Sequence, residues 1–197
     1  WRDWSSDVCS SDLTISEVGG FSVTLRNGKR TYLIETSQKG IEWMKLTATG
    51  VASHGSVINR NNAVTKLADA VAKIGNYSWP QRLTKTNEIF FKRIAELSGK
   101  TYDPNNLQPL LDEIGTMARM IGATLNNTAN PSMLEAGYKA NVIPQSATAV
   151  VDGRTLPGYE KELLDTVKAL VGPDVTVESL VSDIPDRKST RLNSSHA

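Results

Sequence analysis

The sequence offers few of the side chains that cross-link small proteins or bind metals through sulfur. Among 197 residues there is one cysteine, Cys9, and there are two histidines, His54 and His196. A single thiol forms no intramolecular disulfide, so a disulfide framework is excluded. A zinc site built from several thiolates is excluded for the same reason.

Long apolar runs and an excess of either charge are also missing. No apolar run reaches the roughly 18 residues that a membrane-spanning helix needs, so the sequence predicts no membrane span. Lys and Arg number 22, against 21 Asp and Glu. A near-neutral balance lacks the basic surface that binds nucleic acid or anionic lipid. We therefore expect neither partner. Separately, we expect a cytoplasmic location.

Both ends of the chain read like a translated sequencing adapter. Residues 3–13 match one reading frame of a common short-read adapter, and residues 186–196 match its reverse complement. The alternative is an ordinary pair of polar tails, but two matches in opposite orientation argue against chance. We therefore expect residues 1–13 and 186–197 to be adapter-derived and to take no part in the fold.

Without these ends, the segment 14–185 has no cysteine and one histidine, His54. Four basic and four acidic residues lie in the ends, so 18 basic and 17 acidic residues remain. The length suits one domain of ordinary size, and equally a part of a larger protein.

Strand-like and helix-like segments alternate along the remaining chain. Asn27-Gly28 is a hairpin turn signal, and residues 41–49 alternate between apolar and polar side chains, as a half-buried strand does. Residues 126–131 read as a polar loop. The pattern predicts helices over 59–72, 83–97, 107–125 and 159–170, and strands over 21–25, 30–36, 41–49, 133–142, 147–151 and 175–180.

The order of these elements predicts the fold class. From residue 41, with the two middle helices left out, the order is strand, helix, strand, strand, helix, strand. This is the βαββαβ pattern of a ferredoxin-like sandwich, an α/β (α+β) fold with helices on one face of a sheet. We therefore predict such a domain over 41–180, with a helical insertion at about 83–125 and a short strand-rich segment, 14–40, before it.

Polar residues collect at the ends of predicted strands. Asn141 precedes the strand at 147–151, Arg154 follows it, and His54 lies at another strand end. Such donors can bind a carboxylate or stabilise a developing negative charge. Each also has a plain structural interpretation: Asn141 could cap a turn, Arg154 could be a surface arginine paired with Asp152, and His54 could be a loop histidine.

Five short motifs stand out along the chain. They are Glu17-Val-Gly-Gly20, Gly50-Val-Ala-Ser-His54-Gly-Ser56, Asn62-Ala-Val64, Asn141-Val-Ile-Pro144 and Val151-Asp-Gly-Arg154-Thr-Leu-Pro-Gly158. Together they resemble one family, the dinuclear-zinc amidohydrolases and metallopeptidases. It includes glutamate carboxypeptidase, succinyl-diaminopimelate desuccinylase, acetylornithine deacetylase and aminoacylase, and the resemblance covers nearly all of 14–185.

The resemblance implies a catalytic domain that holds two zinc ions and an inserted ferredoxin-like lid that forms a homodimer. In this chain 41–180 would be the lid, 14–40 the last piece of the first catalytic segment, and 181–185 the return to the catalytic domain. The implied reaction is zinc-assisted hydrolysis of an amide or peptide bond in an N-acyl amino acid or small peptide.

The resemblance also implies roles for four residues. His54 of one subunit would reach the partner's active site and stabilise the oxyanion. Arg154, with its planar fork, and Asn141 would bind a substrate carboxylate. Glu17, otherwise a solvated loop acid, would ligate one zinc ion.

The family's remaining metal ligands and its glutamate base have no counterpart in this chain. We therefore predict that the chain alone is an inactive fragment that binds no stoichiometric zinc. The alternative is a non-enzymatic ferredoxin-like module for dimerisation or ligand binding, because a fold does not determine a function.

Overall fold

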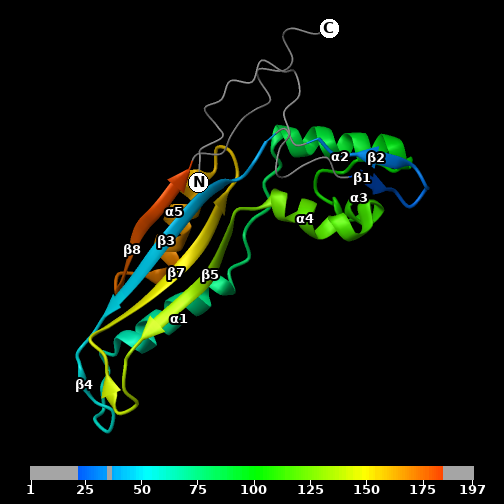
Figure 1. The fold of residues 1–197 in the computed structure, drawn as a ribbon. Helices are drawn as coiled ribbons and strands as arrows, with labels where there is room; N and C mark the ends of the chain where they lie inside the picture. Colours follow the sequence, from blue (N-terminus) through cyan, green and yellow to red (C-terminus); the bar gives the residue numbers. More distant parts are fainter. Residues whose placement is uncertain (1–21, 35–36, 184–197) are drawn as a thin grey trace, which may run out of the picture.

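Four long antiparallel strands form the main sheet, in the order β5-β7-β3-β8. The computed structural model describes residues 22–34 and 37–183 (Figure 1). The strands are β3 (Gly40–Thr49), β5 (Thr128–Ala136), β7 (Ser146–Thr155) and β8 (Val175–Asp183), and helices α1 (Ala63–Gly75) and α5 (Glu160–Val171) cover one face. Along the chain this is the predicted strand-helix-strand-strand-helix-strand order, and the predicted α/β fold class is confirmed.

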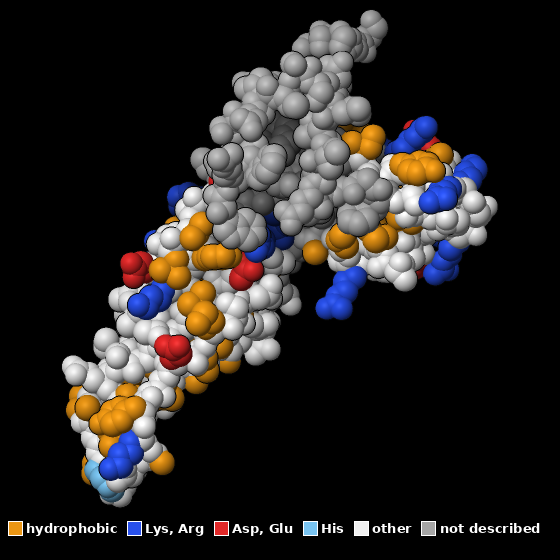
Figure 2. Space-filling view, viewed as in Figure 1, with side chains coloured by type: hydrophobic (Ala, Val, Ile, Leu, Met, Phe, Trp, Pro, Cys, Tyr) orange, Lys and Arg blue, Asp and Glu red, His pale blue; other side chains and the backbone are white. Residues whose placement is uncertain are grey.

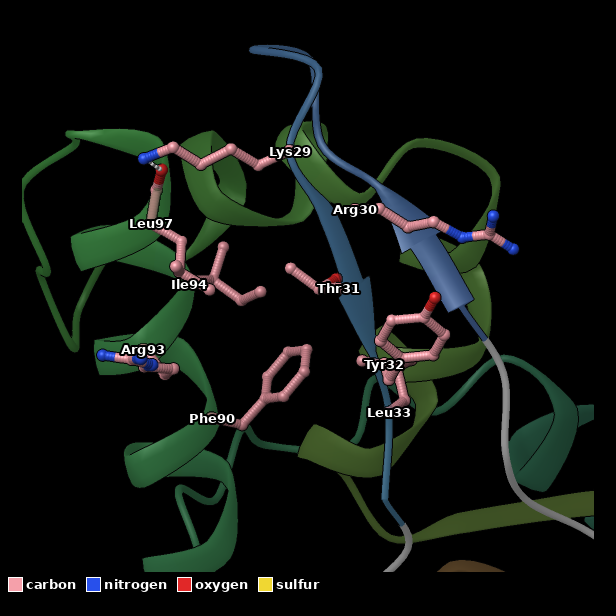
Figure 3. Close-up of a pocket in the computed structure, with 9 residues that line it drawn as sticks. All are labelled: Lys29, Arg30, Thr31, Tyr32, Leu33, Phe90, Arg93, Ile94 and Leu97. Atoms are coloured by element: carbon pink, nitrogen blue, oxygen red, sulfur yellow. Dashed lines mark hydrogen bonds between the residues drawn. The ribbon is translucent and has the colours of Figure 1, made fainter.

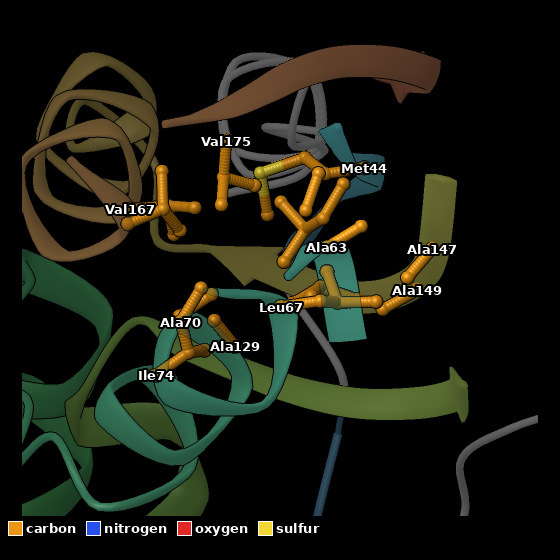
Figure 4. Packing of buried hydrophobic residues seen from close by; sticks show 14 of the residues in the cluster. Met44, Ala63, Leu67, Ala70, Ile74, Ala129, Ala147, Ala149, Val167 and Val175 are labelled. Carbon is orange, nitrogen blue, oxygen red and sulfur yellow. The ribbon is translucent and has the colours of Figure 1, made fainter. Parts of the chain in front are cut away.

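The alternation of β3 determines which face of the sheet is covered. Met44, Leu46 and Ala48 are fully buried on the helix side, whereas Trp43 and Lys45 lie on the opposite face. The buried residues form one core with apolar side chains of both helices (Figure 4). Burying one such side chain contributes about 1.5–3 kcal/mol, so this core holds the helices on the sheet.

Small residues in β7 let the layers approach closely. A Cβ added at Gly153 would lie 2.5 Å from the carbonyl oxygen of Glu42 on β3 and 3.1 Å from a methyl group of Leu163 on α5. The Glu42 oxygen belongs to the backbone of β3, which cannot yield that much space. Glycine at position 153 therefore keeps β7 in register beside β3, one residue before Arg154.

Helix α1 begins at Ala63, later than the predicted start at residue 59. The side chain of Asn62 accepts a hydrogen bond from the Val64 N–H at 2.9 Å and caps the helix. The side chain of Asn59 instead accepts from the Asn61 N–H at 2.8 Å. These polar side chains hold the preceding residues in a turn.

A second hydrophobic core lies beside the first, between the inserted helices and a hairpin. The hairpin strands are β1 (Ser22–Thr24) and β2 (Arg30–Tyr32), and α2 spans Lys85–Ser98. Val23 and Leu25 of the hairpin pack with Phe91, Ile94 and Leu110. The inserted helices thus pack on the hairpin, to one side of the main sheet (Figure 1).

The single helix predicted over 107–125 is wrong. The segment is broken into α3 (Gln108–Leu111), the 3₁₀ segment η2 (Asp112–Met117), α4 (Ala118–Gly122) and the 3₁₀ segment η3 (Ala123–Leu125). Gly115 has φ of +56° and ψ of −124°, which an α-helix does not accommodate. The apolar spacing survives this break, which is why the pattern suggested one helix.

A small two-stranded sheet forms the far tip of the molecule. It pairs β4 (Ser53–His54) with β6 (Val142–Ile143) (Figure 1). The predicted strand at 133–142 is shifted: β5 already begins at Thr128, within the predicted loop, and ends at Ala136. Pro131 is tolerated because β5 is an edge strand with an irregular register at this point. None of the helices described here is long and apolar enough to cross a bilayer.

Candidate functional site

His54 and Asn141 meet at the tip, although 87 residues separate them. The Gly55 N–H donates to the Asn141 carbonyl at 2.8 Å, and His54 lies opposite Val142 in the β4–β6 pair. The side-chain amide of Asn141 is 3.3 Å from Nε2 of His54. Both side chains are exposed, and the histidine is visible at the extreme end of the molecule (Figure 2).

Ser56 determines which nitrogen of His54 carries the proton. Its backbone N–H donates to Nδ1 at 3.2 Å, and its hydroxyl lies 2.8 Å from the same nitrogen. A backbone N–H can only donate, so Nδ1 accepts and the neutral ring carries its proton on Nε2. The structure places the amide nitrogen of Asn141 nearest Nε2, at 3.3 Å, so a proton on Nε2 requires the flipped amide, whose oxygen would accept it. The result is an N–H donor presented at the tip.

Arg154 lies at the opposite end of the main sheet, on the face that α1 and α5 leave open. Its Nε and Nη2 donate to the two carboxylate oxygens of Asp152 at 2.8 and 3.1 Å. The Asp152 carboxylate also accepts the indole N–H of Trp43 at 3.1 Å. The side chains of Arg154 and Asp152 are 39% and 36% exposed, so the pair is reachable from solvent.

Within one chain, the length of β7 separates the pair His54 and Asn141 from Arg154. Ser146 is at the tip end of β7 and Arg154 is eight residues further along. At about 3.3 Å per residue, the arginine stands roughly 26 Å from that end. The structure therefore brings His54 and Asn141 together and leaves Arg154 apart from both.

Lys39 joins the arginine end and was missed from the sequence. Its ammonium group donates to the carbonyl oxygens of Ala123 and Asn126 at 3.1 and 2.7 Å, and to the Thr128 hydroxyl at 3.3 Å. Burial, and secondly the positive charge of Arg154, lowers the pKa of Lys39 to about 8 against the opposing effect of Asp152. Nothing in the local sequence pattern distinguishes Lys39 from other lysines. Trp43 could have been found, because it is an aromatic residue at a position where the alternation of the strand predicts a solvent-facing side chain.

The proposed metal ligand Glu17 lies outside the described residues. Within 22–34 and 37–183, no three His, Cys, Asp or Glu side chains come together as a metal site would require. The candidate residues that the structure does describe, together with Lys39, are hydrogen-bond donors or cations, which suit an anionic group.

A pocket of about 490 Å³ lies between β2 and α2, away from both polar groups (Figure 3). Its cations already have partners within the chain. Lys29 donates to the Leu97 carbonyl at 3.0 Å, Arg93 pairs with Glu96 at 2.7 Å, and Arg30 donates to Ser22 at 2.9 Å. We do not assign a function to this pocket.

Comparison with known proteins gives consistent results. The family model for the M20 peptidase dimerisation domain matches residues 36–175. A probable carboxypeptidase S-like 2 of Dictyostelium discoideum is 29% identical over 153 residues, which is 75% of this chain and 30% of that protein. The N-fatty-acyl-amino acid synthase/hydrolase PM20D1 of Xenopus tropicalis is 28% identical over 145 residues, 69% of this chain and 28% of that protein.

Among solved structures, an M20 family metallo-carboxypeptidase of Sulfolobus solfataricus aligns with 81% of this chain and 44% of its own, at 14% identity and a TM-score of 0.48. The chain thus spans less than a third of the length of the two curated relatives it matches.

Proposed function

Because the chain belongs to the family of M20 peptidase dimerisation domains, we propose that it is the lid of a zinc-dependent hydrolase. The enzyme cleaves an amide or peptide bond of an N-acyl amino acid or small peptide. Residues 41–180 form the lid, with the helical insertion at about 83–125. Residues 14–40 and 181–185 belong to the adjoining catalytic domain, which would hold the two zinc ions.

One observation carries this proposal. His54 and Asn141 lie at the tip, and Arg154 lies at the opposite end of the main sheet, which we call the base. They are too far apart to act on one substrate within one chain. Two copies related by a two-fold axis can place the tip of one beside the base of the other. A complete site then contains His54 and Asn141 of one subunit and Arg154 of its partner.

The chemistry of the two groups supports a division of roles. The Nε2–H of His54 suits the oxyanion that forms when water attacks an amide carbonyl. Arg154 suits the carboxylate of the amino acid that is released. A carboxypeptidase and an N-acyl-amino-acid hydrolase, as the two relatives are named, both cleave an amide beside such a carboxylate.

Zinc ligation is not assigned to this part of the chain. The described residues hold no suitable group of ligands, so we assign them contacts to substrate and transition state alone. We propose that the chain by itself has no hydrolase activity.

Subunit mixing in the full-length enzyme tests the composite site. His54→Ala and Arg154→Ala each inactivate a homodimer. In a hybrid of the two, one site keeps the arginine of its own subunit and the histidine of its partner. Because half of randomly mixed dimers are hybrids with one good site of two, activity recovers to about a quarter of wild type.

The matched control is the double variant His54→Ala/Arg154→Ala mixed with wild type. Its hybrid dimers have no complete site, so activity falls below the level expected from dilution. If proven subunit exchange restores nothing in the first mixture, the two residues do not act across the dimer. The alternative, a non-enzymatic dimerisation or ligand-binding module, predicts that neither variant changes any hydrolysis by the full-length protein.

A further inference from the structure

The contacts of Arg154 with Asp152 occupy one edge of the guanidinium group. An arginine has five N–H donors in a plane, which form two forks that can each hold a carboxylate. Asp152 takes the side fork, formed by Nε and Nη2. The end fork, formed by Nη1 and the second hydrogen of Nη2, makes no hydrogen bond to the residues the structure describes.

Trp43 fixes the carboxylate that holds the arginine. It lies directly opposite Asp152 in the β3–β7 register, and its indole N–H donates to Oδ1. Trp43 is 42% exposed on the open face, where Figure 2 shows apolar side chains among charged ones. An indole N–H and the side fork of an arginine together leave the Asp152 carboxylate little rotational freedom, so Arg154 is held in one orientation.

Lys39 adds a second positive charge close to Arg154 and Asp152. Arg154 and a protonated Lys39 contribute two positive charges, and Asp152 contributes one negative charge. Lys39 uses its N–H groups on the ends of η3 and β5. Lys39 therefore acts on a bound anion through its charge and not through a direct contact. The end fork of Arg154 remains available to form hydrogen bonds with the ligand.

We propose that Asp152 and Trp43 are positioning residues that hold Arg154 with its end fork directed at the substrate carboxylate. This rests on the proposed function, in which Arg154 binds that carboxylate. The competing interpretation is that Asp152 occupies Arg154 as an internal partner. The two interpretations predict opposite effects when the Asp152 charge is removed. If Asp152 competes with the ligand for Arg154, its removal strengthens the binding of an anion. If Asp152 positions Arg154, its removal weakens that binding.

The test uses this chain, labelled with ¹⁵N, and follows the Arg154 Nε–H and the Trp43 indole N–H by NMR. Arg154→Lys identifies the arginine signal. The probe is N-acetyl-L-alanine, and its neutral amide is the control ligand. We expect a saturable shift of the Arg154 signal with the carboxylate and none with the amide.

The decisive variant is Asp152→Asn, which keeps the size of the side chain and removes its charge. We expect its dissociation constant for N-acetyl-L-alanine to rise by about threefold to tenfold, since a group that is no longer preorganised loses affinity on binding. Trp43→Phe, which removes the indole donor, weakens binding by less. Glu178→Gln is the matched control: it removes an equally negative side chain from the same open face, opposite Lys45, and leaves the affinity unchanged or slightly improved.

Each result separates the claims. Equal or tighter binding by Asp152→Asn overturns the positioning role while the carboxylate role of Arg154 stands. No shift in the unmodified chain overturns both. Circular dichroism and the remaining indole signals show whether a weakened variant is still folded.

Discussion

The tip and the base of the main sheet hold their polar residues in different ways. At the tip, His54 stands on the two-residue strand β4 and Asn141 directly precedes the two-residue strand β6, and backbone groups of Ser56 and Gly55 orient them. At the base, Arg154 stands on a ten-residue strand and is held by an ion pair. The tip therefore presents hydrogen-bond donors on a small projecting two-stranded sheet, and the base presents a charged group on a long strand.

This difference suits the two tasks that the proposed function assigns to these residues. A donor for an oxyanion must approach the reacting carbonyl, and a narrow projecting tip can enter a site on another subunit. A group that fixes the substrate carboxylate works best on a rigid element, because small displacements cost much of the gain from orientation. The following predictions test this contrast between tip and base.

The largest expected effect is at the tip. In the full-length enzyme, His54→Ala lowers kcat by about 100- to 1,000-fold, the usual loss for one oxyanion donor, with KM changed much less. Steady-state kinetics on an N-acyl amino acid measure both constants.

Ser56→Ala provides the control at the tip, because the backbone N–H that directs the His54 proton to Nε2 remains. Its kcat should stay within about tenfold of wild type, since one orienting hydrogen bond is lost. If His54→Ala raised KM and left kcat unchanged, His54 would be a substrate-binding residue and the contrast with Arg154 would fail.

The rigidity of the base can be tested with a pair of glycines. Gly153→Ala places a Cβ 2.5 Å from the Glu42 carbonyl oxygen, whereas Gly55→Ala at the tip meets the Asn141 backbone at an ordinary 3.4 Å. We expect Gly153→Ala to destabilise the chain by about 1–3 kcal/mol, as overpacked core substitutions do. Gly55→Ala should change stability by less than about 0.5 kcal/mol.

Urea unfolding of this chain, followed by circular dichroism, measures both variants. Equal stability of the two would show that β7 can shift at Gly153, and Arg154 would then not stand on a rigid strand.

The sequence predicted the main sheet and its two helices because their patterns are long. Ten residues of β3 alternate without interruption, and Leu67, Ile74, Leu163 and Val167 are spaced for one face of a helix. The tip strands were missed because two residues show no periodicity. They exist because β4 and β6 pair with each other, which no local pattern reveals.

The candidate residues were found in the sequence, but their grouping was not. Asn141 comes before β7 and Arg154 near its end, so the length of that strand already separates them. What the sequence did not contain was the pairing that brings His54 to Asn141. It also gave no sign of the register that sets Trp43 opposite Asp152.

The smallest expected effect concerns Lys39 at the base. Its pKa is lowered from the ordinary 10.5 to about 8, mainly by burial and then by Arg154, with Asp152 opposing. Between these two pH values the unfolded chain holds the Lys39 proton more tightly than the folded chain does. The free energy of unfolding therefore rises with pH across this window, and below about pH 8 the full cost of the buried charge remains.

Lys39→Met keeps most of the length of the side chain and removes the charge. Its Tm relative to wild type should be highest near pH 7 and should decline as the pH is raised from about 8 to 10.5. A change of about 1 kcal/mol corresponds to about 2–4 °C in Tm for a domain of this size. Calorimetry of both chains across this range isolates Lys39, because other titrating groups are common to the two. A Tm difference that stays constant with pH would mean that Lys39 keeps its ordinary pKa. Burial beside Arg154 would then not destabilise its charged form.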